Sequence, residues 1–230
     1  MYLSRLSPGE DMVLFGVSGI RLNRDEAISL ALEDAARQAA FFEQVEGWLI
    51  QRELIGPGFL DYRSDNVAEL YFSQDYRNLV ADLRFDPEND VFIYNQALFV
   101  RVRYPGADRG GISYLPNRIN GRPGWIDNPP AAISGYAAGV GYAGPRLFFK
   151  DAVIASYENA AFSIIKNTFT TLIADESQMW GPGAFDFSST SSNQVAAKGV
   201  LRGFYILDTW ADPRTMAVWT LAVAREAVRR

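Results

Sequence analysis

Residues 16–36, GVSGIRLNRDEAISLALEDAA, and residues 141–161, GYAGPRLFFKDAVIASYENAA, decide how we interpret the fold. The two stretches lie 125 positions apart and align without a gap. Identical residues stand at Gly16 and Gly141, Gly19 and Gly144, Arg21 and Arg146, Leu22 and Leu147, Ala27 and Ala152, Glu33 and Glu158, Ala35 and Ala160, and Ala36 and Ala161. Self-similarity at a fixed separation is the signature of a repeated unit. The sequence therefore predicts a tandem duplication.

The first copy predicts a strand, a long helix and a pair of strands. Residues 12–18 form an apolar strand candidate, and Asn23 is a suitable N-cap for the helix that follows. Small apolar residues at helical spacing predict that this helix runs from Asp25 to about Gln51. Further elements are expected as a short helix over 66–76 and strands over 79–85 and 91–104, joined by an acidic turn at 86–90.

The second copy predicts the same order of elements. We expect a strand over 136–142, a helix over about 147–173, and a hairpin of strands 200–210 and 216–225. Pro213 favours a turn between the two hairpin strands, because proline restricts φ to the value that the turn needs. The fold class is therefore predicted as α+β, with two tandem β-α-β-β units, each a long helix packed on a small, mostly antiparallel sheet.

The predicted domain boundaries follow from the repeat. Residues 1–104 are the degenerate first unit, residues 105–130 a Gly- and Pro-rich linker, and residues 131–230 the second unit. Residues 181–193, GPGAFDFSSTSSN, are expected to form an exposed loop that reaches a neighbouring molecule.

Composition excludes several classes of chemistry. The chain of 230 residues contains no Cys and no His, which removes thiol nucleophiles, disulfides, the usual zinc sites and imidazole acid–base catalysis. Its net charge of −5 makes it a poor binder of nucleic acids, because phosphate contacts require a concentrated basic surface. No apolar run reaches the roughly 20 residues of a membrane-spanning helix.

The second copy resembles the LPP20-like family of bacterial envelope proteins, which includes LPP20 lipoproteins and FlgP-like flagellar proteins. The resemblance covers about residues 123–226 and rests on the order of four segments. These are PGWIDNPP at 123–130, YAAGVG at 136–141, the Ala-rich helix from Asp151, and the hairpin from LRGFYI at 201–206 to WTLAVAR at 219–225.

The resemblance implies a non-enzymatic structural or assembly role in the cell envelope, with no catalytic residues, cofactor or metal. The implied partners are other copies of the chain and other envelope proteins, flagellar or surface-appendage proteins among them. The implied location is the periplasm, the outer membrane or the cell surface of a bacterium, with a signal removed from the chain. A lipid anchor is not expected, since lipoprotein members carry it on a Cys.

Three patterns leave other chemistries open. Residues 139–144, GVGYAG, match the G-x-G-x-x-G of dinucleotide sites, which needs a parallel βαβ unit. Glu33 and Glu158 could act as paired carboxylates in glycoside hydrolysis, or could serve as structural ion-pair partners. The acidic turns at 86–90 and 208–212 could hold Ca²⁺, although neither has the spacing of an EF-hand loop.

Aromatic side chains provide the candidate contact residues. We expect interface positions at Trp125 in the segment 123–130, at Trp180 next to the expected loop at 181–193, and at Phe185 and Phe187 within that loop. A different class of function remains open, namely a periplasmic module that binds a small molecule or a glycan between the two units through loop aromatics.

Overall fold

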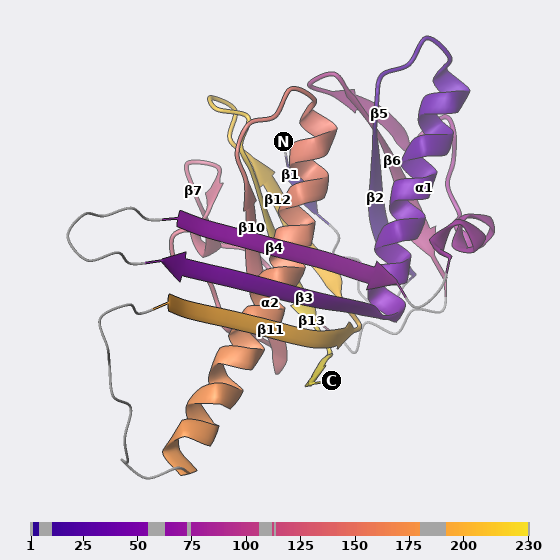
Figure 1. Cartoon of the computed structure of the whole chain (residues 1–230). Helices are drawn as coiled ribbons and strands as arrows, with labels where there is room; N and C mark the ends of the chain where they lie inside the picture. Colours follow the sequence, from indigo (N-terminus) through magenta and orange to yellow (C-terminus); the bar gives the residue numbers. More distant parts are fainter. Residues whose placement is uncertain are drawn as a thin grey trace.

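The chain is an α+β protein in which two long helices each lie on an antiparallel sheet (Figure 1). The computed structural model describes residues 2–4, 11–54, 63–72, 75–105, 112, 114–179 and 192–229. The expected loop at 181–193 lies almost wholly outside the described residues.

The first sheet has the strand order β2-β6-β5 and carries helix α1. Its elements are β2 (Met12–Gly19), α1 (Arg24–Glu43), β5 (Val91–Tyr94) and β6 (Ala97–Tyr104). The Asn23 side chain accepts a hydrogen bond from the Asp25 N–H at 2.9 Å, as expected of an N-cap. Asn95 and Gln96 connect β5 to β6 with positive φ angles of 47° and 59°, the geometry of a two-residue type I′ hairpin turn.

The second sheet repeats this plan around helix α2. Its elements are β10 (Tyr136–Ala143), α2 (Phe149–Met179), β12 (Tyr205–Ala211) and β13 (Val218–Ala224), with the strand order β12-β13-β10. Two short strands extend it, β1 (Tyr2–Ser4) beside β12 and β9 (Ala132–Ile133) beside β10. In both sheets, the strand before the helix pairs with the second strand of the hairpin.

The contacts between helix and strand also recur at the predicted separation. A Cβ on Gly16 would lie 1.8 Å from the Ala31 carbonyl oxygen, and one on Gly141 would lie 1.9 Å from that of Ser156. Both pairs of backbones can approach this closely only because the strand residue is glycine. These recurrences support the duplication hypothesis, while a common origin of the halves stays a prediction.

A third sheet joins the two halves and had no counterpart in the sequence-based prediction. It has the order β14-β11-β3-β4 and consists of β3 (Val45–Leu54), β4 (Arg63–Phe72), β11 (Ser192–Arg202) and β14 (Glu226–Arg229). Strands β3 and β11 pair along their length, with Val45 opposite Leu201 and Leu54 opposite Ser192. The sheet crosses α2 (Figure 1), and Gly47 admits the Ile165 side chain there, since a Cβ would lie 2.5 Å from it.

Several predicted elements are wrong. Helix α1 ends at Glu43 instead of Gln51, and Val45 and Trp48, which favour extended backbone, belong to β3. The predicted short helix over 66–76 is largely strand β4. The predicted strand over 79–85 is mostly the 3₁₀ helix η1 (Tyr76–Asp82), whose first turn is capped by the Asp75 side chain.

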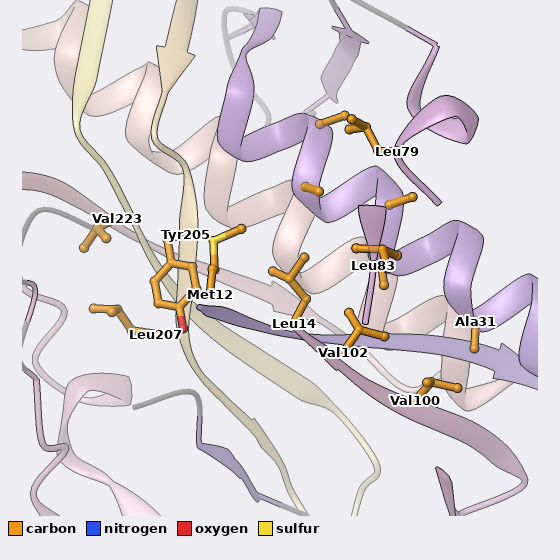
Figure 2. Packing of buried hydrophobic residues seen from close by; sticks show 14 of the residues in the cluster. Met12, Leu14, Ala31, Leu79, Leu83, Val100, Val102, Tyr205, Leu207 and Val223 are labelled. Carbon is orange, nitrogen blue, oxygen red and sulfur yellow. The ribbon is translucent and has the colours of Figure 1, made fainter. Parts of the chain in front are cut away.

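The predicted units pack against each other through three shared clusters of buried side chains among the described residues. Figure 2 shows Met12 of β2 close to Tyr205 of β12, so that the first and second sheets meet through buried side chains. The segment expected as a linker contributes β7 (Arg118–Ile119), β8 (Arg122–Pro123) and the 3₁₀ helix η2 (Gly124–Ile126), and Trp125 joins the same core.

Replacement of Gly141 by alanine tests the close helix-to-sheet contact. The added Cβ must displace the backbone of α2, and we expect Gly141→Ala to lower the free energy of unfolding by about 3 kcal/mol or more. Gly144→Ala is the matched control, since the nearest atom to its Cβ is the Tyr142 hydroxyl at 3.6 Å. Urea denaturation of both variants measures the difference, and equal stabilities would refute this packing.

Candidate functional site

Three aromatic side chains lie next to one another across the second sheet. Tyr142 on β10 pairs in register with Trp219 on β13, which pairs with Trp210 on β12. The ring centroids of Tyr142 and Trp219 are 4.9 Å apart, and those of Trp219 and Trp210 are 5.3 Å apart. We call Tyr142, Trp219 and Trp210 the aromatic row.

The aromatic row faces away from α2. Successive strand residues point to opposite faces of a sheet, so the neighbours of the row show its direction. Thr220 faces α2, where its hydroxyl hydrogen-bonds that of Ser156 at 2.7 Å, and Gly141 packs against the same helix. The side chains of Tyr142 and Trp219 therefore point to the other face, on which Tyr142 is 51% exposed and both tryptophans are half-buried.

A cation, Arg122, lies at the Trp210 end of the aromatic row. The guanidinium of Arg122 lies 5.9 Å from the centre of the Trp210 ring, within the range of a cation–π interaction. Arg122 also forms an ion pair with Asp127 at 2.7 Å. Both partners are well exposed, so the pair orients the guanidinium but adds little to stability.

A buried carboxylate holds the segment beside the row in place. Asp208 on β12 is 0% exposed and accepts hydrogen bonds from the Trp125 indole N–H at 2.9 Å and from the Arg118 guanidinium at 3.1 Å. This corrects the expectation that Trp125 is an interface residue, because its side chain is 3% exposed and belongs to the core. The other interface candidates, Trp180, Phe185 and Phe187, lie outside the described residues.

A hollow of about 230 Å³ separates the two helices. Residues of both halves line it, with Arg21, Glu33 and Arg37 from the first half and Lys150 and Ile154 from α2. The hollow therefore lies between the two halves, and charged side chains of both signs surround it.

Asp34, at the floor of this hollow, is the centre of a buried polar network. Its carboxylate accepts hydrogen bonds from the Val17 N–H at 3.0 Å, the Gln38 amide at 3.0 Å and the Tyr157 hydroxyl at 2.6 Å. Burial raises the pKa of Asp34 above its usual value despite these donors. Burial, together with the nearby Asp34, raises the pKa of Tyr157 as well, so its hydroxyl keeps the proton that it donates.

The repeated glutamates have different environments. Glu158 of α2 forms an ion pair with Arg37 of α1, whereas Glu33 lines the hollow. Sequence reasoning chose these two residues and missed Asp34, whose partner Tyr157 is 123 positions away in the chain. The available signal was the helical spacing of Asp34 from Ala27 and Ala31, which places an acidic side chain on the buried face of an Ala-rich helix.

The other two patterns have structural explanations. A Cβ on Gly139 would lie 2.7 Å from the Ala160 carbonyl oxygen, and β10 pairs with an antiparallel strand, so residues 139–144 lack the parallel βαβ unit that a dinucleotide site requires. In the turn at 86–90, Asp90 binds Arg101, and Asp86 accepts hydrogen bonds within the turn. The described residues contain no cluster of three or more acidic side chains that could hold a metal ion.

No family model, curated protein or solved structure matches the chain. The likeness to LPP20-like proteins therefore stays a prediction. Among the described residues, no helix has the length and apolar character needed to cross a bilayer.

The pH dependence of stability tests the Asp34 network. Since the pKa of Asp34 is raised in the folded protein, its ionisation opposes folding, and this contribution is absent below the usual Asp pKa of about 4 and grows as the pH rises. An asparagine can accept the same two N–H groups and donate to Tyr157, without ionising. We therefore expect the stability of the wild type relative to Asp34→Asn to fall in urea denaturation as the pH rises above about 4. A difference that is constant or rises with pH would contradict this assignment.

Proposed function

We propose that the protein is a non-enzymatic assembly protein of the bacterial cell envelope, which binds copies of itself or other envelope proteins through the aromatic row. The observation that carries this proposal is the set of Tyr142, Trp219 and Trp210 on the sheet face opposite α2, where Tyr142 is exposed, both tryptophans are half-buried and Arg122 lies beside them. Tyrosine, tryptophan and arginine are the side chains that contribute most binding energy at protein interfaces.

The row is preorganised for binding. Each ring is held by a neighbouring ring across a strand pair, and Arg122 is held by Asp127. Side chains that are ordered before binding lose little conformational entropy when a partner covers them. Aromatic side chains also bury large apolar areas with few rotatable bonds. A small surface of this kind therefore supports a specific contact.

An open strand edge offers a second route to self-association. In the described part of the chain, β4 pairs with β3 alone, and Tyr71 near its end is 51% exposed. A free edge of ten residues can add a strand from another molecule through backbone hydrogen bonds. The envelope setting, and flagellar or surface-appendage partners in particular, rest on the family resemblance alone.

One other function is supported by the same residues. Sugar rings stack on tryptophan and tyrosine faces, and the Arg122–Asp127 pair would offer hydrogen bonds to hydroxyl groups. A periplasmic glycan-binding module is therefore the second candidate. A glycan-binding function predicts a monomer that binds saccharide. An assembly function predicts a protein complex.

Removal of the row's side chains tests the assembly proposal. In size-exclusion chromatography with light scattering, the wild type should show a mass above that of the monomer, rising with concentration. Trp219→Ala and Arg122→Glu should weaken this association by about tenfold or more, because each removes a side chain of a type that dominates interface energies. Arg122 is well exposed, so its replacement leaves the core intact.

Trp48→Ala provides the matched control, because Trp48 is a half-buried tryptophan on the outer face of the third sheet. This variant should associate like the wild type if the contact is the aromatic row, whereas weakened association would point to the edge of β4, which Trp48 adjoins. A wild type that stays monomeric at high concentration and binds no envelope protein would overturn the proposal. Calorimetric titration with peptidoglycan fragments tests the second candidate, and Trp219→Ala should then abolish the binding of saccharide.

A further inference from the structure

Three segments form one end of the molecule, which we call the loop end. They are residues 20–24 at the start of α1, residues 91–96 of the β5–β6 hairpin and residues 144–150 at the start of α2. Both helices begin at the upper end of the view in Figure 1. The segments also touch one another, because the Lys150 side chain lies against Gly19, next to the first segment, and the rings of Tyr94 and Phe149 are 5.6 Å apart.

The loop end exposes large apolar side chains from each of its three segments. Leu22 and Leu147 occupy equivalent positions of the two predicted copies and have relative exposures of 111% and 91%. The other exposed apolar residues of this end are Ile20, Phe92, Ile93 and Phe148. A hollow of about 380 Å³, lined by Ile20, Phe92 and Ile93 among others, lies beside them. Large apolar side chains gathered on one surface mark a contact site.

The loop end also carries cations beside its apolar side chains. The three segments contain Arg21, Arg24, Arg146 and Lys150, and four acidic residues lie within two positions of the segments, namely Asp25, Glu26, Asp90 and Asp151. Arg21 and Lys150 pair with acidic residues of the following helical turns. Arg24 and Arg146 have no ion-pair partner among the described residues, so both can bind an external anion.

We propose that the loop end docks on the surface of an anionic phospholipid bilayer. The leucine, isoleucine and phenylalanine side chains enter the boundary between headgroups and acyl chains, and Arg24 and Arg146 lie at the level of the phosphates. The apolar side chains project from separate loops, which a fluid hydrocarbon layer accommodates without matching pockets. Arg24 and Arg146 select an anionic surface, because Arg21 and Lys150 are already paired with acidic side chains of the chain itself.

Vesicle flotation tests this inference with the full chain. We expect the wild type to float with vesicles of phosphatidylcholine and phosphatidylglycerol at low salt, and much less with phosphatidylcholine alone or at high salt. Leu22→Ser combined with Leu147→Ser should reduce binding to the anionic vesicles by at least about tenfold, given the transfer free energy of a leucine side chain. Arg24→Glu combined with Arg146→Glu should abolish the preference for anionic lipid.

The matched control combines Leu115→Ser with Ile119→Ser, which removes two apolar side chains of similar exposure from the segment around β7. This variant should float like the wild type. The inference is overturned if the wild type does not float at low salt, or if the Leu22/Leu147 variant floats as well as the wild type. A change in the mass of that variant without lipid would identify the loop end as a protein contact instead. Trp219→Ala should float like the wild type. Vesicle flotation therefore tests membrane binding independently of the assembly proposal.

Discussion

The close approach of strand and helix backbones at Gly16 and Gly141 is the constraint on which the rest of the structure depends. Each glycine allows a helix carbonyl to lie where a side chain would otherwise stand, which brings α1 and α2 directly onto their sheets. Small residues on the helices complete this contact, as Ala35 does opposite Gly16. Because Gly141 faces α2, the next residue of β10, Tyr142, points to the opposite face of the sheet. The aromatic row is thus a consequence of how the sheet buries its other face.

Polar and backbone contacts then lock the two halves together. Tyr157 of α2 donates to Asp34 of α1, and the ion pair of Arg37 and Glu158 joins the same helices. Strands β3 and β11 add a continuous ladder between the halves. A buried carboxyl such as Asp34 is costly unless each of its oxygens is hydrogen-bonded, so these contacts specify one arrangement of the helices as well as stabilising it. The hollow between the helices and the loop end both exist only in this arrangement, since each draws residues from both halves.

Local signals in the sequence were sufficient for the elements whose partners are near in the chain. The strands at 12–18 and 136–142, the N-cap at Asn23 and the hairpin around Pro213 were predicted, because apolar pattern, capping and turn chemistry act within a few residues. Strands β3 and β4 were missed, because the alternation that defines β3 is satisfied by β11, about 150 residues away. Asp34 and Trp125 were misjudged for the same reason, as their partners Tyr157 and Asp208 lie on distant elements. The pairing of Trp210 with Trp219 could be predicted from the sequence, because the hairpin register around the predicted turn places them opposite each other.

The positions of the aromatic row and the loop end relative to each other link the two proposed contacts. Tyr142 is two residues before Gly144, where the second β–α segment of the loop end begins, so the row lies near that end of the sheet. If the loop end binds a bilayer, the aromatic row lies close to the membrane, on a sheet face that extends away from the bilayer. Neighbouring molecules on one membrane would meet at this face with a restricted orientation. Confinement of this kind raises the effective concentration of a weak interface, so a contact of modest size between single rows could assemble an array on a membrane while staying weak in solution.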